Sequence, residues 1–256
     1  MMTLTKNTGY LISFVLLFSL CRAVFYTPNR NPVPLFEESG DLYVDVSTNL
    51  VTKADFTAGL ALTESIGAYG SYSTAKQSNT NTTTNTEYKY QYNGNMVNLG
   101  LGYFVNKEKS DRTRFEIFGD FASGTYNNKY TDSGTNLYLN GQYTRIGIMP
   151  NIGFTNHETN FSFAYSVKLS RITFSNMKTN DALFWKNDIE RLKSKTSYGT
   201  IEHALNIRYG FDKVKFQFQF GVYQGINSDE SLNAIPKLNF SSQFGVVFHT
   251  NVFGKN

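Results

Sequence analysis

The stretch Val214-Lys215-Phe216-Gln217-Phe218-Gln219-Phe220-Gly221-Val222-Tyr223 alternates strictly between two kinds of residue. Successive side chains of a β-strand point to opposite faces, so the even-numbered residues form an apolar face and the odd-numbered residues a mostly polar one. The same alternation recurs over most of the chain. Repeated with this polarity, it is typical of a membrane barrel with a lipid-facing exterior and a wet interior.

The composition agrees with alternating strands and excludes several other classes. Charged residues make up 17% of the 256 residues, whereas about 25% is usual for a soluble domain. Aromatic residues make up 16%, yet the mean hydropathy is only −0.35, so transmembrane helices are not expected beyond the N-terminus. The net charge of +4 is spread along the chain. We therefore expect no nucleic-acid partner.

The alternation predicts about ten strands, in an all-β, single antiparallel transmembrane β-barrel. Eight or twelve strands are alternatives, because the third strand and the long fourth and sixth regions are ambiguous. Pro150 cannot donate a ladder hydrogen bond, so a bulge or a weakly paired site is expected there. The ten expected strands lie near residues 40–48, 54–63, 66–75, 95–105, 113–124, 140–154, 160–173, 200–210, 214–223 and 238–250.

The lengths of the connections alternate with strand parity. Connections after the second, fourth, sixth and eighth strands are short, whereas those after the third, fifth, seventh and ninth are long; the first, near 49–53, is the one short odd connection. Outer-membrane barrels have short periplasmic turns and longer extracellular loops, and a soluble sandwich has no reason to follow this rule. The pattern predicts an outer-membrane barrel with both termini periplasmic and the long loops extracellular. The long connections span residues 76–94, 125–139, 174–199 and 224–237.

The chain divides into three parts by composition. Residues 1–21 have a positive start and an apolar run of signal-peptide length. Cys21 ends this run and is a candidate for lipid attachment; ordinary cleavage near Cys21 or Ala23 is the alternative. Residues 22–39 hold three of the five prolines and are expected to form an extended periplasmic linker. Residues 40–253 are expected to form the barrel.

Two of the long connections have a distinct character. Residues 76–95 are a polar, low-complexity tract, which we expect to be mobile and solvated. Residues 180–195 carry Trp185, Ile189 and Leu192 at helical spacing behind Asn180, a candidate N-cap. A short helix that covers the barrel mouth is expected, and a ligand or partner site is the alternative.

Charged residues recur on the inward face of the expected strands. Charges in a narrow lumen must be paired or hydrated, because burying a charge without a partner is costly. A salt-bridged network that plugs the lumen is the main interpretation, and a small polar diffusion channel is the alternative. The nine inward charges are Asp45, Arg114, Glu116, Asp120, Arg145, Lys168, Glu202, Arg208 and Lys215.

An enzyme at the outer rim is the less favoured alternative. An omptin-like protease uses aspartates and a histidine there, and Asp120, Asp181, Asp188 and His203 are the residues to consider. The register of His203 faces lipid, however, and no local motif joins it to the aspartates. No CxxC, HExxH, Walker or GxSxG pattern occurs, so no cofactor, metal or catalytic residue is predicted. A protease or a lipid hydrolase would be the reaction class.

Five phrases of the sequence are distinctive. They are Asn31-Pro32-Val33-Pro34-Leu35-Phe36-Glu37-Glu38-Ser39-Gly40-Asp41-Leu42, Ala61-Leu62-Thr63-Glu64-Ser65-Ile66-Gly67, Gly100-Leu101-Gly102-Tyr103-Phe104, Arg145-Ile146-Gly147-Ile148-Met149-Pro150-Asn151-Ile152-Gly153-Phe154 and Tyr209-Gly210-Phe211-Asp212-Lys213-Val214-Lys215-Phe216-Gln217. Together they resemble a known family, the small outer-membrane β-barrel proteins of Bacteroidota. The resemblance covers nearly the whole mature chain and implies a signal peptide, often of lipoprotein type, and an outer-membrane location. It implies no known activity.

The last expected strand resembles the signal that the barrel-insertion machinery reads. Gln243, Gly245 and Phe248 match that signal, whereas Thr250 stands where a second apolar residue is usual. The expected partners are therefore outer-membrane lipid and this machinery. The expected role is structural or in surface interactions.

Overall fold

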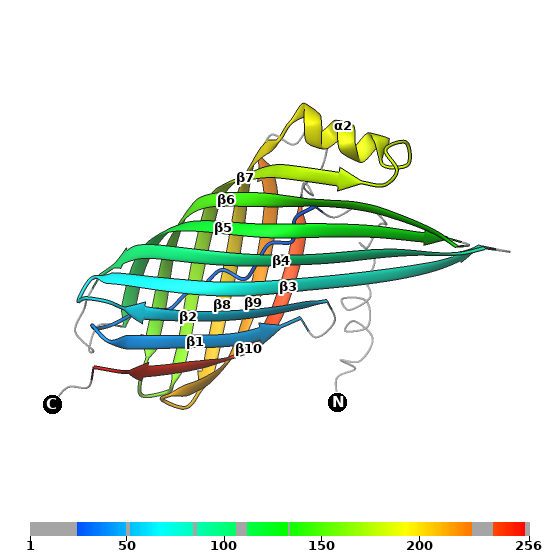
Figure 1. The fold of residues 1–256 in the computed structure, drawn as a ribbon. Coiled ribbons are helices and arrows are strands. Elements are labelled where there is room, and N and C mark those ends of the chain that lie inside the picture. Colours follow the sequence, from blue (N-terminus) through cyan, green and yellow to red (C-terminus); the bar gives the residue numbers. More distant parts are fainter. Residues whose placement is uncertain are drawn as a thin grey trace, which may run out of the picture.

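Ten antiparallel strands close into a single barrel, in which each strand pairs with its neighbours in the sequence and the last pairs with the first (Figure 1). This computed structural model describes residues 25–49, 52–83, 86–105, 112–132, 134–226 and 238–253. The predicted fold class and the strand number of ten are confirmed. Residues 1–21, with Cys21, lie outside the described residues.

The strands differ greatly in length. The longest lie in the middle of the chain, and the first two are short. Their bounds are β1 Asp41–Thr48, β2 Lys53–Ala61, β3 Ile66–Thr83, β4 Thr86–Phe104, β5 Thr113–Asp132, β6 Thr135–Asn156, β7 Phe161–Thr179, β8 Ser197–Gly210, β9 Val214–Ile226 and β10 Asn239–Asn251.

The period-two pattern sets which face of each strand is buried. In β9 the side chains of Gln217 and Gln219 are buried in the lumen, while Phe216 on the outer face is 65% exposed. Every strand presents large apolar side chains on the outer surface, as the alternation predicts. One example from each strand, in order from β1 to β10, is Val46, Phe56, Tyr72, Leu99, Phe121, Ile146, Leu169, Ile207, Phe216 and Phe244.

Two predicted loops are in fact long hairpins. β3 and β4 stay paired up to Thr83 and Thr86, through the tract expected to be mobile and solvated. β5 and β6 stay paired up to Asp132 and Thr135. The outward positions of these stretches are polar, so they lack the apolar outer face used to find strands, but Thr and Tyr favour extended backbone. The hairpins project beyond the shorter strands, and we call this side of the barrel the hairpin end (Figure 1).

The opposite side of the barrel, here called the turn end, carries short connections. They span residues 62–65, 157–160 and 211–213, and the described chain ends there at residue 253. Near this end Pro150 pairs with Ile117, while the β6–β7 ladder passes from Ile148 to Asn151 without a change of register. The β6–β7 register skips Met149 and Pro150, so the weak pairing expected at Pro150 is confirmed on the side that faces β7. The β6–β7 irregularity lies instead between Asn140 and Gln142.

A short helix, α2 Lys186–Ser194, follows β7 at the hairpin end (Figure 1). The predicted N-cap Asn180 is wrong, because its side chain bonds the backbone of Asn136 and Tyr138. Asp181 instead accepts the N–H groups of the turn that leads into the helix. Among the residues that the structure describes, no helix has the length and apolar character needed to cross a membrane.

Candidate functional site

A chain segment fills the inside of the barrel. Residues 25–36, here called the lumenal segment, run through the interior without regular secondary structure (Figure 1). All of them are buried except residues 27 and 28, which are half-buried. This corrects the expected periplasmic linker. The segment is extended, as its prolines suggest, but its large apolar side chains, including Phe25, Val33 and Phe36, are removed from water inside the barrel.

Side chains of the wall satisfy the backbone of the lumenal segment. The side-chain amide of Gln219 bonds both backbone groups of Asn31. Its Oε1 accepts the Asn31 N–H at 3.3 Å, and its Nε2 donates to the Asn31 carbonyl at 3.0 Å. The Phe36 N–H donates to Glu116 Oε1 at 2.8 Å. Buried backbone groups need such partners, and the prolines reduce the number of donors to satisfy. The carbonyls of Pro28, Pro32 and Val33 accept from Lys53, Asn151 and Arg208 respectively.

Arg145 joins the wall to the segment. Its guanidinium donates to Asp120 of the wall at 2.7 Å, and to Tyr26 and Asn29 of the segment at 2.7 and 2.8 Å. Glu202 lies 3.8 Å away and accepts a hydrogen bond from the Tyr26 hydroxyl at 3.1 Å. The Arg145 and Asp120 side chains have no solvent exposure, so each depends on the other for compensation.

Further ion pairs bind the segment along its length. Arg30 pairs with Asp45 of β1 at 2.7 Å, and both side chains are buried. Just beyond the segment, Glu37 lies 3.2 Å from Arg114 and 3.1 Å from His157. Arg30 of the segment therefore compensates Asp45 in the wall, and Glu37, which follows the segment, compensates Arg114 at the turn end.

Glycines in the wall make room for the segment near the turn end. A Cβ atom built on Gly67 would lie 2.6 Å from the ring of Phe36, and one on Gly153 would overlap the side chain of Leu35. Leu35 itself has a φ of +59°, in the left-handed region that costs an L-residue about 1–2 kcal/mol. The wall and the segment thus have complementary shapes.

Aromatic rings enclose the segment at the hairpin end. The Phe25 ring lies 5.3 Å from Tyr126 and 6.3 Å from Phe174, centroid to centroid. Trp185 and Leu192 belong to the same buried cluster, and Ile189 packs against it. The three residues predicted on the helix therefore converge on the start of the lumenal segment, and α2 packs over this end of the lumen.

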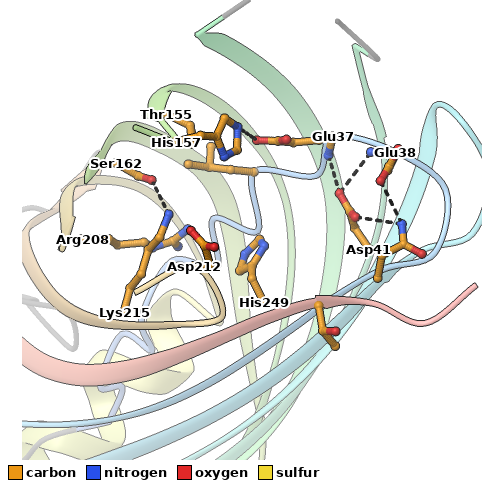
Figure 2. A pocket seen from close by; sticks show the side chains of 13 residues that line it. Glu37, Glu38, Asp41, Thr155, His157, Ser162, Arg208, Asp212, Lys215 and His249 are labelled. Carbon is orange, nitrogen blue, oxygen red and sulfur yellow. Dashed lines mark hydrogen bonds and ion pairs between the residues drawn. The ribbon is translucent and has the colours of Figure 1, made fainter. Parts of the chain in front are cut away.

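A cavity of about 200 Å³ lies at the turn end. Figure 2 shows Glu37, His157 and Lys215 around it, with His249 between them. Lys215 Nζ lies 3.4 Å from Ser162 Oγ. Two smaller cavities deeper in the barrel hold about 20 and 10 Å³, room for about one water molecule each.

The nine predicted lumenal charges all face inward. Eight are buried and Lys215 is half-buried. Arg145, Lys168, Asp120 and Glu202 form one group, in which Lys168 Nζ lies 3.8 Å from Asp120. Four of the remaining predicted charges contact residues 30–37: Asp45, Arg114, Glu116 and Arg208. Lys215 contacts Ser162 and lines the turn-end cavity.

The prediction missed the charges that complete these contacts. Lys53 and Asp55 of β2 are buried and 3.4 Å apart, and the alternation that puts Phe56 outside also puts them inside. Arg30 and Glu37 were missed because the segment was read as a linker outside the barrel. Its five large apolar residues were the signal that could have revealed its burial.

The residues considered for a rim enzyme are not brought together. His203 lies on the outer face, as predicted, with Nδ1 2.6 Å from the Tyr165 hydroxyl. Asp120 points into the lumen on the other side of the wall, and Asp181 holds the turn before α2. Within the described ranges, His, Cys, Asp and Glu side chains form no group of three that could hold a metal ion.

No protein-family model matches the chain, and no curated protein matches it. Similar solved structures include the outer membrane protease OmpT from Escherichia coli, with 9% identity, a TM-score of 0.44, and coverage of 82% of this chain and 90% of that one. The translocator domain of the autotransporter NalP from Neisseria meningitidis has 12% identity, a TM-score of 0.44, and coverage of 81% and 86%. The KdgM porin has 11% identity, a TM-score of 0.35, and coverage of 81% and 98%. These values concern the fold and identify no activity.

The Arg145 contacts lead to a first prediction about stability. Asp120→Ala removes the nearest carboxylate of Arg145 and the carboxylate partner of Lys168, both buried, so the free energy of unfolding should fall by about 3–5 kcal/mol. Urea unfolding in micelles, followed by the fluorescence of Trp185, the only tryptophan, measures it. Glu190→Ala breaks an exposed ion pair of α2 and should cost less than about 1 kcal/mol. Equal losses would contradict the role given to Asp120.

The fit between wall and segment leads to a second prediction. Gly67→Ala forces the Phe36 ring to move and should lower the free energy of unfolding by about 1–3 kcal/mol. Gly70→Ala on the same strand is the matched control, because its new Cβ would lie 3.5 Å from the nearest atom, on Leu99. It should change stability by no more than about 0.5 kcal/mol. If Gly67→Ala were as mild as the control, Phe36 would not occupy this position.

Proposed function

We propose that this chain is an outer-membrane β-barrel closed by its own lumenal segment, with a structural or surface-interaction role. The observation that carries the proposal is the burial of residues 25–36 against the wall, centred on Arg145. On this proposal the hairpin end is extracellular. The lipid anchor at Cys21 and the kinship with the barrels of Bacteroidota are part of the same proposal.

The outer surface supports insertion in a membrane. Each of the ten strands exposes large apolar side chains there, far more than the scattered apolar residues of an ordinary soluble surface. A closed barrel also pairs its backbone groups between strands, which is a condition for crossing lipid. Outer-membrane lipid is therefore the first partner, and the match of Gln243, Gly245 and Phe248 to the assembly signal supports the insertion machinery as the second.

The interior supports a closed rather than a conducting barrel. The cavity at the turn end has Leu35 and Glu37 in its lining, and the two deeper cavities have room for about one water molecule each. A hydrated ion path would require the lumenal segment to leave. That would break the contacts of Arg145 with Tyr26 and Asn29 and expose buried charges of the wall.

Conductance across a planar bilayer tests this closure. The wild-type protein should give no persistent single-channel steps, whereas a variant without residues 25–36 should give them. A synthetic peptide with the sequence of residues 25–36 should reduce the conductance of that variant, and a scrambled peptide should not. Persistent steps from the wild-type protein would favour the alternative, a small diffusion channel.

A charge introduced on the outer face tests whether this face of β9 contacts lipid. Phe218→Arg places a cation beside Phe244, 4.9 Å from it between ring centroids, and should destabilise the folded barrel by about 2–4 kcal/mol in lipid. Ile226→Arg, at the end of the same strand, is the control and should cost about 0–1 kcal/mol. Refolding into vesicles followed by urea titration measures both. Normal stability of Phe218→Arg would argue against a lipid-facing β9.

A further inference from the structure

We infer that the barrel carries its own N-terminal residues across the membrane, so that the mature chain begins at the hairpin end, on the side of α2. The inference rests on the proposed membrane location, but it goes further, because it fixes the side on which the residues before Phe25 emerge. It also replaces the expectation that both termini lie on the periplasmic side.

The residues of β5 that contact the segment, directly or through Arg145, show how far the segment extends along the barrel. Phe36 bonds Glu116, near the turn end of this strand. Asn29 contacts Arg145, whose other partner Asp120 lies four residues beyond Glu116 on the same inward face of β5. Phe25 packs on Tyr126, near the hairpin end. From Glu116 to Tyr126 the strand rises by about 33 Å at ~3.3 Å per residue, so the segment passes through most of the barrel.

The two ends of the described chain therefore lie at opposite ends of the barrel. Phe253 packs beside Gly40, where the chain enters β1 at the turn end. Phe25 lies in the aromatic cluster with Phe174 and Trp185 at the hairpin end. No part of the lumenal segment doubles back between these points, since its wall partners follow one another in order.

The length of chain before Phe25 limits how far from the hairpin end the mature chain can start. Both modes of processing considered for this chain put the start between Cys21 and Phe25. Four residues span at most about 14 Å, well short of the ~33 Å of strand that separates Tyr126 from Glu116. The start therefore stays at the hairpin end whether or not Cys21 is acylated, and whatever it carries is presented on that side.

Aromatic packing at the hairpin end, where the segment leaves the lumen, holds this end of the segment in place. The Tyr26 ring lies 5.3 Å from that of Tyr143 and 5.7 Å from that of Tyr223, and its hydroxyl accepts from Arg145 at 2.7 Å. Leu192 of α2 and Trp185, the residue just before α2, belong to the same cluster. The cluster takes residues from seven strands, β3 to β9, and from α2, so the place where the segment leaves the lumen is a fixed part of the fold.

Epitope tags at three positions test the inference in intact cells. One tag is inserted between Val24 and Phe25, one in the β3–β4 hairpin between Thr83 and Thr86, and one after Asn256. The first two should bind antibody under the same conditions, whereas the third should differ and need permeabilised cells. An N-terminal tag that behaves like the C-terminal one would overturn the inference. If the hairpin and C-terminal tags behaved alike, the membrane location itself would fail, and the inference with it.

A cysteine cross-link gives the same information if a tag blocks assembly. Phe25→Cys combined with Tyr126→Cys should be joined in the membrane-embedded protein by a thiol-to-thiol cross-linker that spans the space of the two contacting rings, and mass spectrometry identifies the linked peptide pair. Phe25→Cys combined with Phe118→Cys, which lies in the buried cluster of Phe36, should not. Linkage to position 118 in place of 126 would overturn the inference.

Discussion

The compensation of Arg145 is the constraint on which the rest of the interior depends. This guanidinium is fully buried, and a buried charge with incomplete partners costs several kcal/mol. The wall supplies Asp120 and Glu202, and the lumenal segment supplies Tyr26 and Asn29. Neither the wall nor the segment alone supplies all of these partners, so the stability of the barrel depends on the segment.

The same logic extends to both ends of the lumen. At the turn end, a wall without side chains at Gly67 and Gly153 receives Phe36 and Leu35, and Glu37 meets Arg114. At the hairpin end, aromatic rings and α2 enclose Phe25. Electrostatic compensation in the middle and shape complementarity at the ends together account for a segment that has no strand partner of its own.

Much of the fold could be predicted from the sequence because its strongest signal is local. Alternation within β9 shows that Phe216 faces out and Gln217 faces in without any knowledge of the other strands. The inward position of Arg145 and Asp120 follows in the same way. The extended hairpins were missed because residues 76–83 are polar on both faces, so their pairing with β4 leaves no period in the apolar residues.

What the sequence determined by itself was therefore the barrel, its ten strands and the two faces of its wall. Only the tertiary structure decided which charges meet and where residues 25–36 run. Asn29 and Arg145 are far apart in the chain, as are Asn31 and Gln219, and no local period encodes such a pairing. A proline-containing extended segment has the same local conformation in solvent as inside a barrel. Its place depends on partners that exist only once the wall has formed.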